Sequence, residues 1–322
     1  MAIYFAPMEG ITDDIYRRVH AECFSGIDKY FIPFISPTQN LTLTARELRA
    51  VLPENNAGCR AVPQLLTRDA DHFLWAAQVL KDMGYKEVNL NLGCPSGTVT
   101  AKFKGSGMLR DLPMLRAFLD NVMERTPIPV SVKTRIGYEN PEEWGTIYEL
   151  LNGFPLHELI IHPRTREQQY HGEPHRECYA AAKACRNPVV YNGDLFTADD
   201  CRALAAEFPF TSAVMIGRGL LANPALCCEM TGGEAVNREA LRHFCSRLLD
   251  EYQQRYQKNL VLGRMREVLK HIACCFENPQ KPRKAIRKAT TIEALTAASD
   301  ALFALPLNEN PGYDAYIYKG GN

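Results

Sequence analysis

The sequence predicts a (β/α)8 TIM barrel of the α/β class, followed by a small all-helical C-terminal domain. Eight short apolar runs lie between residues 3 and 216, and segments of helical periodicity separate most of them, as is typical of a barrel of parallel strands. After Gly232 and Gly233 no strand-like run occurs before the tail. We therefore expect a barrel over residues 1–233, a helical domain over 234–305 and a tail over 306–322.

The predicted strands are short apolar runs with turn residues at their ends. The second is the weakest, because Pro33 inside it has no backbone N–H to donate. In chain order the predicted strands are Ile3–Ala6, Tyr30–Phe34, Cys59–Leu66, Val88–Leu90, Val130–Lys133, Leu159–His162, Val189–Asn192 and Ala213–Ile216.

Helices are predicted where apolar residues recur at spacings of three and four. One of them has a clear start signal, because Thr197 can cap a helix whose first turn holds Asp199 and Asp200. The barrel helices predicted in this way include Ala70–Met83, Met114–Arg125 and Thr197–Phe208, and those of the helical domain are Arg238–Tyr256, Leu260–Phe276 and Thr291–Phe303.

The composition excludes several classes of protein. The 322 residues carry 37 basic and 37 acidic side chains, so the chain as a whole has no general attraction to polyanions. No run approaches about 18 apolar residues, and Met1–Pro7 lacks the basic start of a signal peptide, so we expect a cytoplasmic protein without a membrane span. The 11 cysteines form no CxxC pair, which indicates reduced thiols and no metal site.

Positive charge is concentrated in the predicted helical domain. Residues 258–288 contain nine basic and two acidic side chains, a net charge of +7, whereas residues 1–257 have a net charge of −4. This distribution indicates a polyanion-binding surface attached to an enzyme body, although a solvated helix face would look similar. The cations that we expect to bind the polyanion are Lys281, Arg283, Lys284, Arg287 and Lys288.

Cys94 is the candidate catalytic residue. It lies in the stretch EVNLNLGCPSGTVTAKFKGSGML, residues 87–109, where a predicted strand ends. Pro95 favours an extended backbone at Cys94, so the thiol is held on a rigid turn at the carboxyl end of a strand. Barrel enzymes carry their reacting groups at this end. The alternative is a cysteine that serves only as a small buried hydrophobe.

Two glycine-containing turns follow the last two predicted strands. Asn192, Gly193 and Asp194 follow the seventh strand, and Gly217 and Arg218 follow the eighth. Barrels often bind a phosphate at these loops, where glycine lets backbone N–H groups approach an anion and arginine supplies a lasting positive charge. The turns predict a phosphorylated ligand or cofactor, although each could be a tight turn alone.

Lys133 and His162 end two further strands. Lys133 continues the alternation of Val130 and Val132, so its ammonium is predicted to point to the barrel mouth, where a buried cation needs a negative partner. That partner is either a bound anion or a carboxylate such as Glu9. His162 is either a neutral hydrogen-bond donor to a ligand or a histidine of the core.

Taken together, these motifs resemble those of the tRNA-dihydrouridine synthases, flavoenzymes that reduce chosen uridines in tRNA. From residue 2 to about residue 225 the motifs follow the family's order and spacing: APMEGITD, NLNLGCPSGTV with the trailing GSGML, SVKTRIG, IIHPRT, VVYNGDL and VMIGRGLLANP. The basic stretch with RMREVLKH is similar to the family's RNA-binding domain. Two places depart from the family pattern: the loop after Cys94 reads GSGMLRD, and Pro163 stands where glycine is common.

The resemblance implies an FMN-dependent oxidoreductase that uses NADPH and acts on tRNA, and we expect a monomer. In the implied reaction, reduced FMN gives hydride to C6 of the uracil and Cys94 gives a proton to C5. Asn91, Arg135 and Arg164 are expected to contact the uracil or the tRNA. The residues expected to hold FMN are Pro7, Met8, Glu9, Gln64, Lys133, His162, Asn192, Gly193, Asp194, Gly217 and Arg218.

Two other functions explain part of this pattern. An FMN barrel that reduces a free pyrimidine would account for the phosphate site and Lys133, but not for the +7 charge of residues 258–288. A tRNA-binding protein with a silent barrel would account for that charge, but not for the combination of Cys94, Lys133 and Arg218. Product formation distinguishes the three functions.

Overall fold

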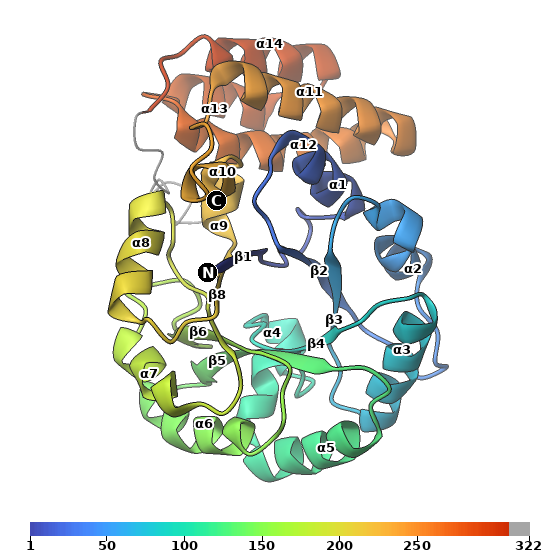
Figure 1. Cartoon of the computed structure of the whole chain (residues 1–322). Helices are drawn as coiled ribbons and strands as arrows, with labels where there is room; N and C mark the ends of the chain where they lie inside the picture. Colours follow the sequence, from blue (N-terminus) through green and yellow to red (C-terminus); the bar gives the residue numbers. More distant parts are fainter. Residues whose placement is uncertain (309–322) are drawn as a thin grey trace.

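The computed structural model describes residues 1–308 and confirms the barrel. Eight parallel strands close into a ring in their chain order, and the last pairs with the first (Figure 1). No helix in residues 1–308 is long and apolar enough to cross a membrane. The strands are β1 Ala2–Phe5, β2 Lys29–Ile35, β3 Ala61–Leu65, β4 Val88–Leu92, β5 Val130–Gly137, β6 Leu159–Thr165, β7 Val189–Tyr191 and β8 Ala213–Ile216.

Helices surround the ring, as the sequence periodicity predicts (Figure 1). The predicted start signal at Thr197 is confirmed: its side chain accepts a hydrogen bond from the Asp200 N–H, and the Asp200 carboxylate accepts one from the Thr197 N–H. The helices of this part are α1 Asp14–Cys23, α2 Ala45–Val51, α3 Ala70–Asp82, α4 Gly97–Thr100, α5 Leu112–Arg125, α6 Trp144–Asn152, α7 Arg176–Ala180, α8 Ala198–Glu207, α9 Arg218–Ala222 and α10 Leu226–Met230.

Two strands contain a proline, and strand pairing is irregular at both places. Pro33 lies in β2 where the register with β3 shifts. Pro163 lies in β6 directly after His162, where the register with β5 shifts. An irregular pairing tolerates a residue that has no N–H to donate. This explains why β2 forms despite its proline, and why Pro163 does not interrupt β6.

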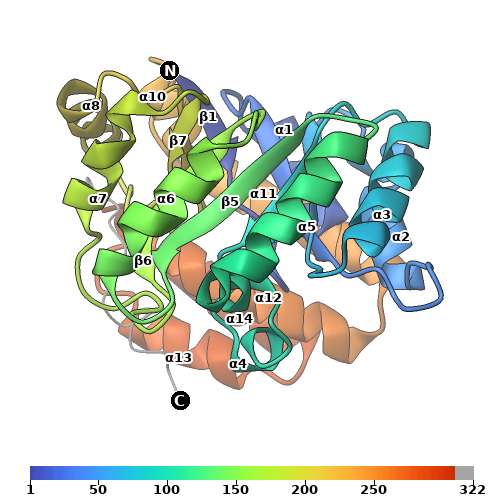
Figure 2. The same cartoon turned by 90° about the horizontal axis from the view of Figure 1, so that it is seen from below.

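The C-terminal unit contains four helices within the described residues, one more than the sequence predicts. They are α11 Arg238–Arg255, α12 Lys258–Ile272, α13 Gln280–Lys288 and α14 Ile292–Phe303. The unpredicted helix is α13, whose nine residues QKPRKAIRK are too polar to show an apolar stripe. Figure 2 shows α13 at the end of the molecule toward which β5 runs, which is the end of the barrel that holds the strand carboxyl termini.

The start of the predicted tail is hydrogen-bonded to the helical unit. The Pro306 carbonyl accepts from the Glu277 N–H at 3.0 Å, and the Asn308 N–H donates to the Cys275 carbonyl at 2.8 Å. The remainder of the predicted tail, residues 309–322, lies outside the described residues.

The helical unit packs on α1 of the barrel (Figure 1). Phe244 of α11 is fully buried, and its ring lies edge-on to those of Tyr16 and His20 on α1. Beside them, Arg264 of α12 forms an ion pair with Asp13 at 2.5 Å. One hydrophobic core therefore continues from the barrel into the helical unit. The division of the chain at residues 233 and 234 stays a prediction.

The inside of the barrel has an apolar part and a polar part. Tyr4, Phe31, Ile160, Val190 and Met215 belong to one apolar cluster. The strands β3, β4 and β5 instead contribute amides, a hydroxyl and an ammonium, and polar groups buried there need internal hydrogen bonds. These polar residues are Gln64, Asn89, Asn91, Ser131 and Lys133.

Candidate active site

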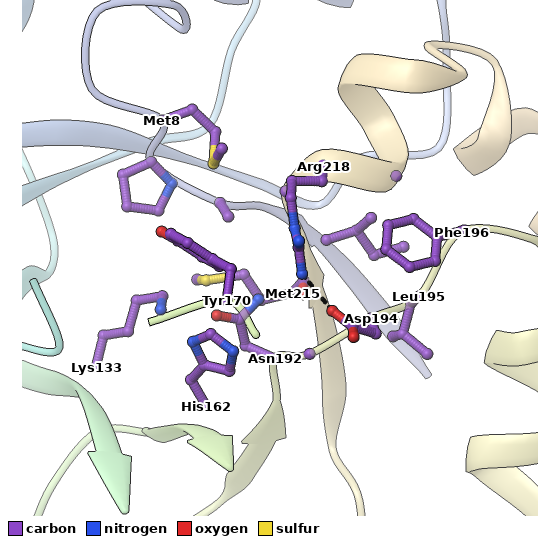
Figure 3. A pocket seen from close by; sticks show the side chains of 16 residues that line it. Met8, Lys133, His162, Tyr170, Asn192, Asp194, Leu195, Phe196, Met215 and Arg218 are labelled. Carbon is purple, nitrogen blue, oxygen red and sulfur yellow. Dashed lines mark hydrogen bonds and ion pairs between the residues drawn. The ribbon is translucent and has the colours of Figure 1, made fainter. Parts of the chain in front are cut away.

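A cavity opens at the carboxyl ends of the strands, where the sequence predicts the ligand site (Figure 3). It encloses about 510 Å³ of empty space including its mouth, which is within the size range of small-molecule sites. Glu9 and Gln64 do not line it, but the other nine predicted cofactor residues do: Pro7, Met8, Lys133, His162, Asn192, Gly193, Asp194, Gly217 and Arg218.

Two charged side chains, Asp194 and Arg218, line one end of the cavity, and a third, Arg164, pairs with Asp194. The Asp194 carboxylate forms ion pairs with Arg218, marked in Figure 3, and with Arg164. Arg164 is fully buried and also donates from Nε to the Gly172 carbonyl at 3.2 Å. Arg164 therefore engages Asp194 from outside the cavity lining, and it is not exposed at a surface open to tRNA. Two guanidinium groups face one carboxylate, so this end has a net positive charge and attracts an anion.

Glycines let the backbone line this end of the cavity closely. A Cβ atom on Gly217 would lie 3.0 Å from Met8 Sδ, and one on Gly193 would lie 3.0 Å from the Tyr191 hydroxyl. The segments after β7 and β8 also pack against each other. The contact is so close that a Cβ atom on Gly219 would lie only 2.1 Å from the Leu195 carbonyl oxygen. Side chains at these three positions would collide with the surrounding protein, so the close packing at this end of the cavity depends on glycine.

Lys133 and His162 supply the polar groups farther along the cavity. Within the described residues, the Lys133 ammonium has no hydrogen bond or ion pair, because Glu9 pairs with Arg46 instead. Burial, reinforced by the charge of Arg135, lowers the pKa of Lys133 to about 7. Burial and the same charge also hold the pKa of His162 well below its ordinary value, so this ring is neutral.

One side chain in the cavity has no signal in the sequence. Tyr170, from the loop between β6 and α7, reaches into the cavity between Lys133 and Arg218 (Figure 3). The Arg218 guanidinium lies 4.9 Å from the centre of the Tyr170 ring. Tyr170 follows Gln169, whose backbone has a left-handed conformation with a φ of 49°. Because glycine is the residue that usually takes this conformation, the turn is not visible in a single sequence.

Cys94 lies on a loop that is held from both sides. Its N–H donates to Asn91 Oδ1 at 2.8 Å, and its carbonyl accepts from Ser106 Oγ at 2.7 Å. Gly105, with a φ of 58°, passes so close that a Cβ atom there would lie 3.0 Å from Cys94 Cβ. The GSGML segment therefore packs directly against Cys94, which explains the small residues at its start.

The surroundings of Cys94 keep its sulfur protonated. Burial raises the pKa of the Cys94 thiol above its ordinary value, and this outweighs the lowering by the Ser96 backbone and by Arg135 and Lys133. A thiol with a raised pKa is the form that can give a proton at neutral pH. The environment of Cys94 is suited to an acid and not to a nucleophile.

Asn91 and Arg135, two predicted substrate contacts, both hold the Cys94 loop. Asn91 Oδ1 accepts from the Gly93 N–H at 3.0 Å as well as from Cys94. Arg135 is 1% exposed and donates to the carbonyls of Gly93 at 2.9 Å and Thr165 at 2.7 Å. Their contacts with substrate stay predictions, whereas their contacts with the loop are part of the structure.

Comparison with known proteins identifies the family. The family model described as dihydrouridine synthase (Dus) matches residues 4–306, which is nearly the whole described chain. The chain belongs to the dihydrouridine synthase family. It is therefore an oxidoreductase.

Relatives of this dihydrouridine synthase family member match most of its length. It is 28% identical over 309 residues to tRNA-dihydrouridine synthase B of Pasteurella multocida, covering 94% of this chain and 91% of that protein. It is 34% identical over 238 residues to a tRNA-dihydrouridine(16) synthase of Pseudomonas putida, covering 70% of this chain and 72% of that protein. Among solved structures, morphinone reductase covers 76% of this chain and 88% of its own with a TM-score of 0.51 at 15% identity, a likeness of fold alone.

In this dihydrouridine synthase family member, part of the positive charge of residues 258–288 lies on one exposed face. Lys270 pairs with Glu267, and Arg264 is used at the contact with the barrel. Arg283 is 4% exposed, beside Cys274 Sγ at 3.9 Å, so it is removed from the predicted surface. The exposed cations of α13 form no ion pair within residues 1–308, and we call them the α13 basic face: Lys281, Lys284, Arg287 and Lys288.

Proposed function

We propose that this protein reduces the C5–C6 double bond of uridine in tRNA, with FMN as cofactor and NADPH as reductant. The observation that carries the proposal is geometric: a cavity lined by Lys133, His162 and Arg218 opens at the carboxyl ends of the strands, and Cys94 follows β4, the strand that pairs with the strand of Lys133. The curated relatives named tRNA-dihydrouridine synthases support the choice of substrate. A free pyrimidine is less well supported, because it gives no role to the α13 basic face.

The residues of the cavity fit FMN at both of its ends. Arg218, oriented by Asp194, and the backbone at Gly193 and Gly217 would bind the phosphate. In this arrangement Asp194 would act through Arg218, since a carboxylate repels a phosphate. Lys133 would neutralise negative charge on the ring system. When bound, FMN would supply the hydride-transfer chemistry that amino-acid side chains lack.

Cys94 would supply the proton of the reaction. Reduction at C6 of the uracil leaves negative charge at C5, and the S–H bond of Cys94 would break as the new C5–H bond forms. The charges of Arg135 and Lys133 act on the Cys94 sulfur and would stabilise the thiolate that remains. The Cys94 N–H donates to Asn91 and the Cys94 carbonyl accepts from Ser106, and these two hydrogen bonds would keep the sulfur in one place during the transfer.

The α13 basic face would hold the tRNA through its phosphates. It lies at the carboxyl-terminal end of the barrel, the end at which the cavity opens (Figure 2). The target uridine must leave its stack to enter a cavity of this kind, and a tRNA loop allows this at lower cost than a duplex. The α13 basic face would thus bind the tRNA backbone, while the cations of the cavity would bind the flavin.

Flavin binding is expected to weaken as pH rises through 7. An anionic ligand selects the charged form of Lys133, and with a pKa of about 7 the charged fraction falls from nearly all at pH 6 to a small part at pH 8. We expect the dissociation constant of FMN, measured by quenching of its fluorescence, to rise about tenfold over this interval. The Lys133→Met variant controls for titration of the FMN phosphate itself. An equal pH dependence in that variant would exclude Lys133 as the cause.

The test of function is product formation on tRNA isolated from cells that lack dihydrouridine. The protein is incubated with FMN, NADPH and this tRNA, and the digested nucleosides are weighed by mass spectrometry. A uridine that gains two hydrogens supports the proposal, and mapping its position identifies the site. Consumption of NADPH by a flavin-loaded protein without this nucleoside would contradict it and favour a free pyrimidine as substrate.

A further inference from the structure

A continuous chain of hydrogen bonds crosses the polar part of the barrel and ends at the Cys94 loop. Asn91 Nδ2 donates to Gln64 Oε1 at 2.7 Å, and Gln64 Nε2 donates to Asn89 Oδ1 at 2.7 Å. Asn89 Nδ2 donates to Ser131 Oγ at 2.9 Å, and Ser131 Oγ donates to Glu87 Oε1 at 2.6 Å. All five side chains are buried, and we call them the amide relay.

The Glu87 end of the amide relay is held by ion pairs. Glu87 Oε2 accepts from the Lys29 ammonium at 2.7 Å, and the same ammonium pairs with Glu158 at 2.9 Å. Lys29 is the first residue of β2, and each glutamate directly precedes a strand, so this cluster lies at the amino-terminal end of the barrel. The amide relay therefore joins the two ends of the barrel, from the ion cluster to the Cys94 loop.

The carboxylate of Glu87 fixes the direction of every hydrogen bond above it. A carboxylate only accepts, so Ser131 must use its hydrogen on Glu87 and can only accept from Asn89. Asn89 must then turn its NH2 group to Ser131 and its oxygen to Gln64. Gln64, in turn, must present its NH2 group to Asn89 and its oxygen to Asn91.

Asn91, the last member of the amide relay, fixes the conformation of the backbone at Cys94. With its NH2 group on Gln64, Asn91 has its oxygen free to accept from the N–H groups of Gly93 and Cys94, as the structure shows. The opposite amide orientation would set an NH2 group against two N–H donors, which is repulsive. The orientation that holds Cys94 is therefore decided by a carboxylate at the other end of the barrel.

We propose that Gln64, Asn89 and Ser131 are positioning residues, which hold the Asn91 amide in the orientation that fixes the Cys94 backbone. The importance of this position for catalysis rests on the proposed function, but the orientation itself does not. For Gln64, the proposal adds a second role beside its predicted contact with the cofactor.

The test measures the hydrogen-exchange rate of the Cys94 N–H directly. Glycine labelled with ¹³C at its carbonyl and cysteine labelled with ¹⁵N mark only Gly-Cys pairs, of which the sequence has two, Gly58-Cys59 and Gly93-Cys94. The Cys59 N–H donates to the Asn56 carbonyl at 3.0 Å, outside the amide relay, and serves as the internal reference. The exchange rates are measured on the full chain, without a need for turnover.

Three variants separate orientation from general destabilisation. Ser131→Ala and Asn89→Leu interrupt the amide relay. Ser212→Ala removes a comparable serine bond, to the Val189 carbonyl at 2.7 Å, elsewhere in the barrel.

We expect the Cys94 N–H to exchange about tenfold faster in Ser131→Ala and Asn89→Leu, with Cys59 unchanged. Ser212→Ala is expected to behave as wild type. In the first two variants kcat for dihydrouridine formation is expected to fall about tenfold with KM for tRNA unchanged. Unchanged Cys94 exchange in Ser131→Ala and Asn89→Leu, or equal acceleration in Ser212→Ala, would overturn the proposal. Absence of dihydrouridine from the wild-type reaction would instead refute the proposed function and leave the exchange result to judge the amide relay.

Discussion

Cys94→Ala is expected to lower the rate of dihydrouridine formation by about 10²–10⁴-fold, the usual contribution of a positioned general acid. Alanine has no proton to give, and the half-buried position of Cys94 gives water little access as a substitute donor. FMN binding is expected to be unchanged, because Cys94 does not line the cavity that would hold the flavin. The rate is measured as product in a single turnover with prereduced enzyme, and the affinity is measured by flavin fluorescence.

The matched control for this prediction is Cys59→Ala. Cys59 is also half-buried, and burial likewise raises its pKa, to about 11, but its Sγ donates to the Arg17 carbonyl, outside the cavity. Loss of a thiol there is expected to leave the rate unchanged. A Cys94→Ala enzyme that forms dihydrouridine at the wild-type rate would remove Cys94 from the mechanism. An equal loss of rate in Cys59→Ala would point to stability instead of proton transfer.

The barrel could be predicted because its signals are local. Each strand is a short apolar run beside turn residues, and Thr197 with Asp200 marks a helix start within four residues. Where prediction failed, the signal was not local. The helix α13 packs through few apolar groups, among them Ile286, and is otherwise polar, so its position is set by neighbours that the periodicity does not show.

The same distinction between local and non-local signals applies to the candidate site. Lys133, His162, Asp194 and Arg218 follow predicted strands, and closing the barrel brings these strand ends to one cavity. Their partners could not be predicted, because they depend on distances between separate elements. The sequence does not reveal that Asp194 lies between two arginines, that Lys133 lacks a carboxylate within the described residues, or that Arg283 points inward. The same holds for the amide relay, whose members lie on three strands and one loop.

The second large effect is expected on tRNA affinity, from substitutions in the α13 basic face. Reversing two cations of the α13 basic face, Lys284→Glu with Arg287→Glu, is expected to weaken tRNA binding about a hundredfold near physiological salt. Each residue is exposed and has no ion pair within residues 1–308, so its charge is available to a phosphate. Two lost phosphate contacts are expected to make the slope of log K against log salt shallower by about two. Affinity is measured by filter binding across a salt series, with flavin absorbance as the check on folding.

The control must carry the same change in net charge on another surface. Lys81→Glu with Lys86→Glu fulfils this, since both lysines are exposed and lie just before β4, at the amino-terminal end of the barrel and away from its mouth. If net charge alone governed tRNA binding, the two double variants would weaken it equally, and the α13 basic face would lose its special role. If the basic face holds the tRNA, the control keeps nearly wild-type affinity and salt slope. The Lys284 and Arg287 variant then also loses turnover at low tRNA concentration, and recovers it at saturating tRNA because the cavity and Cys94 are intact.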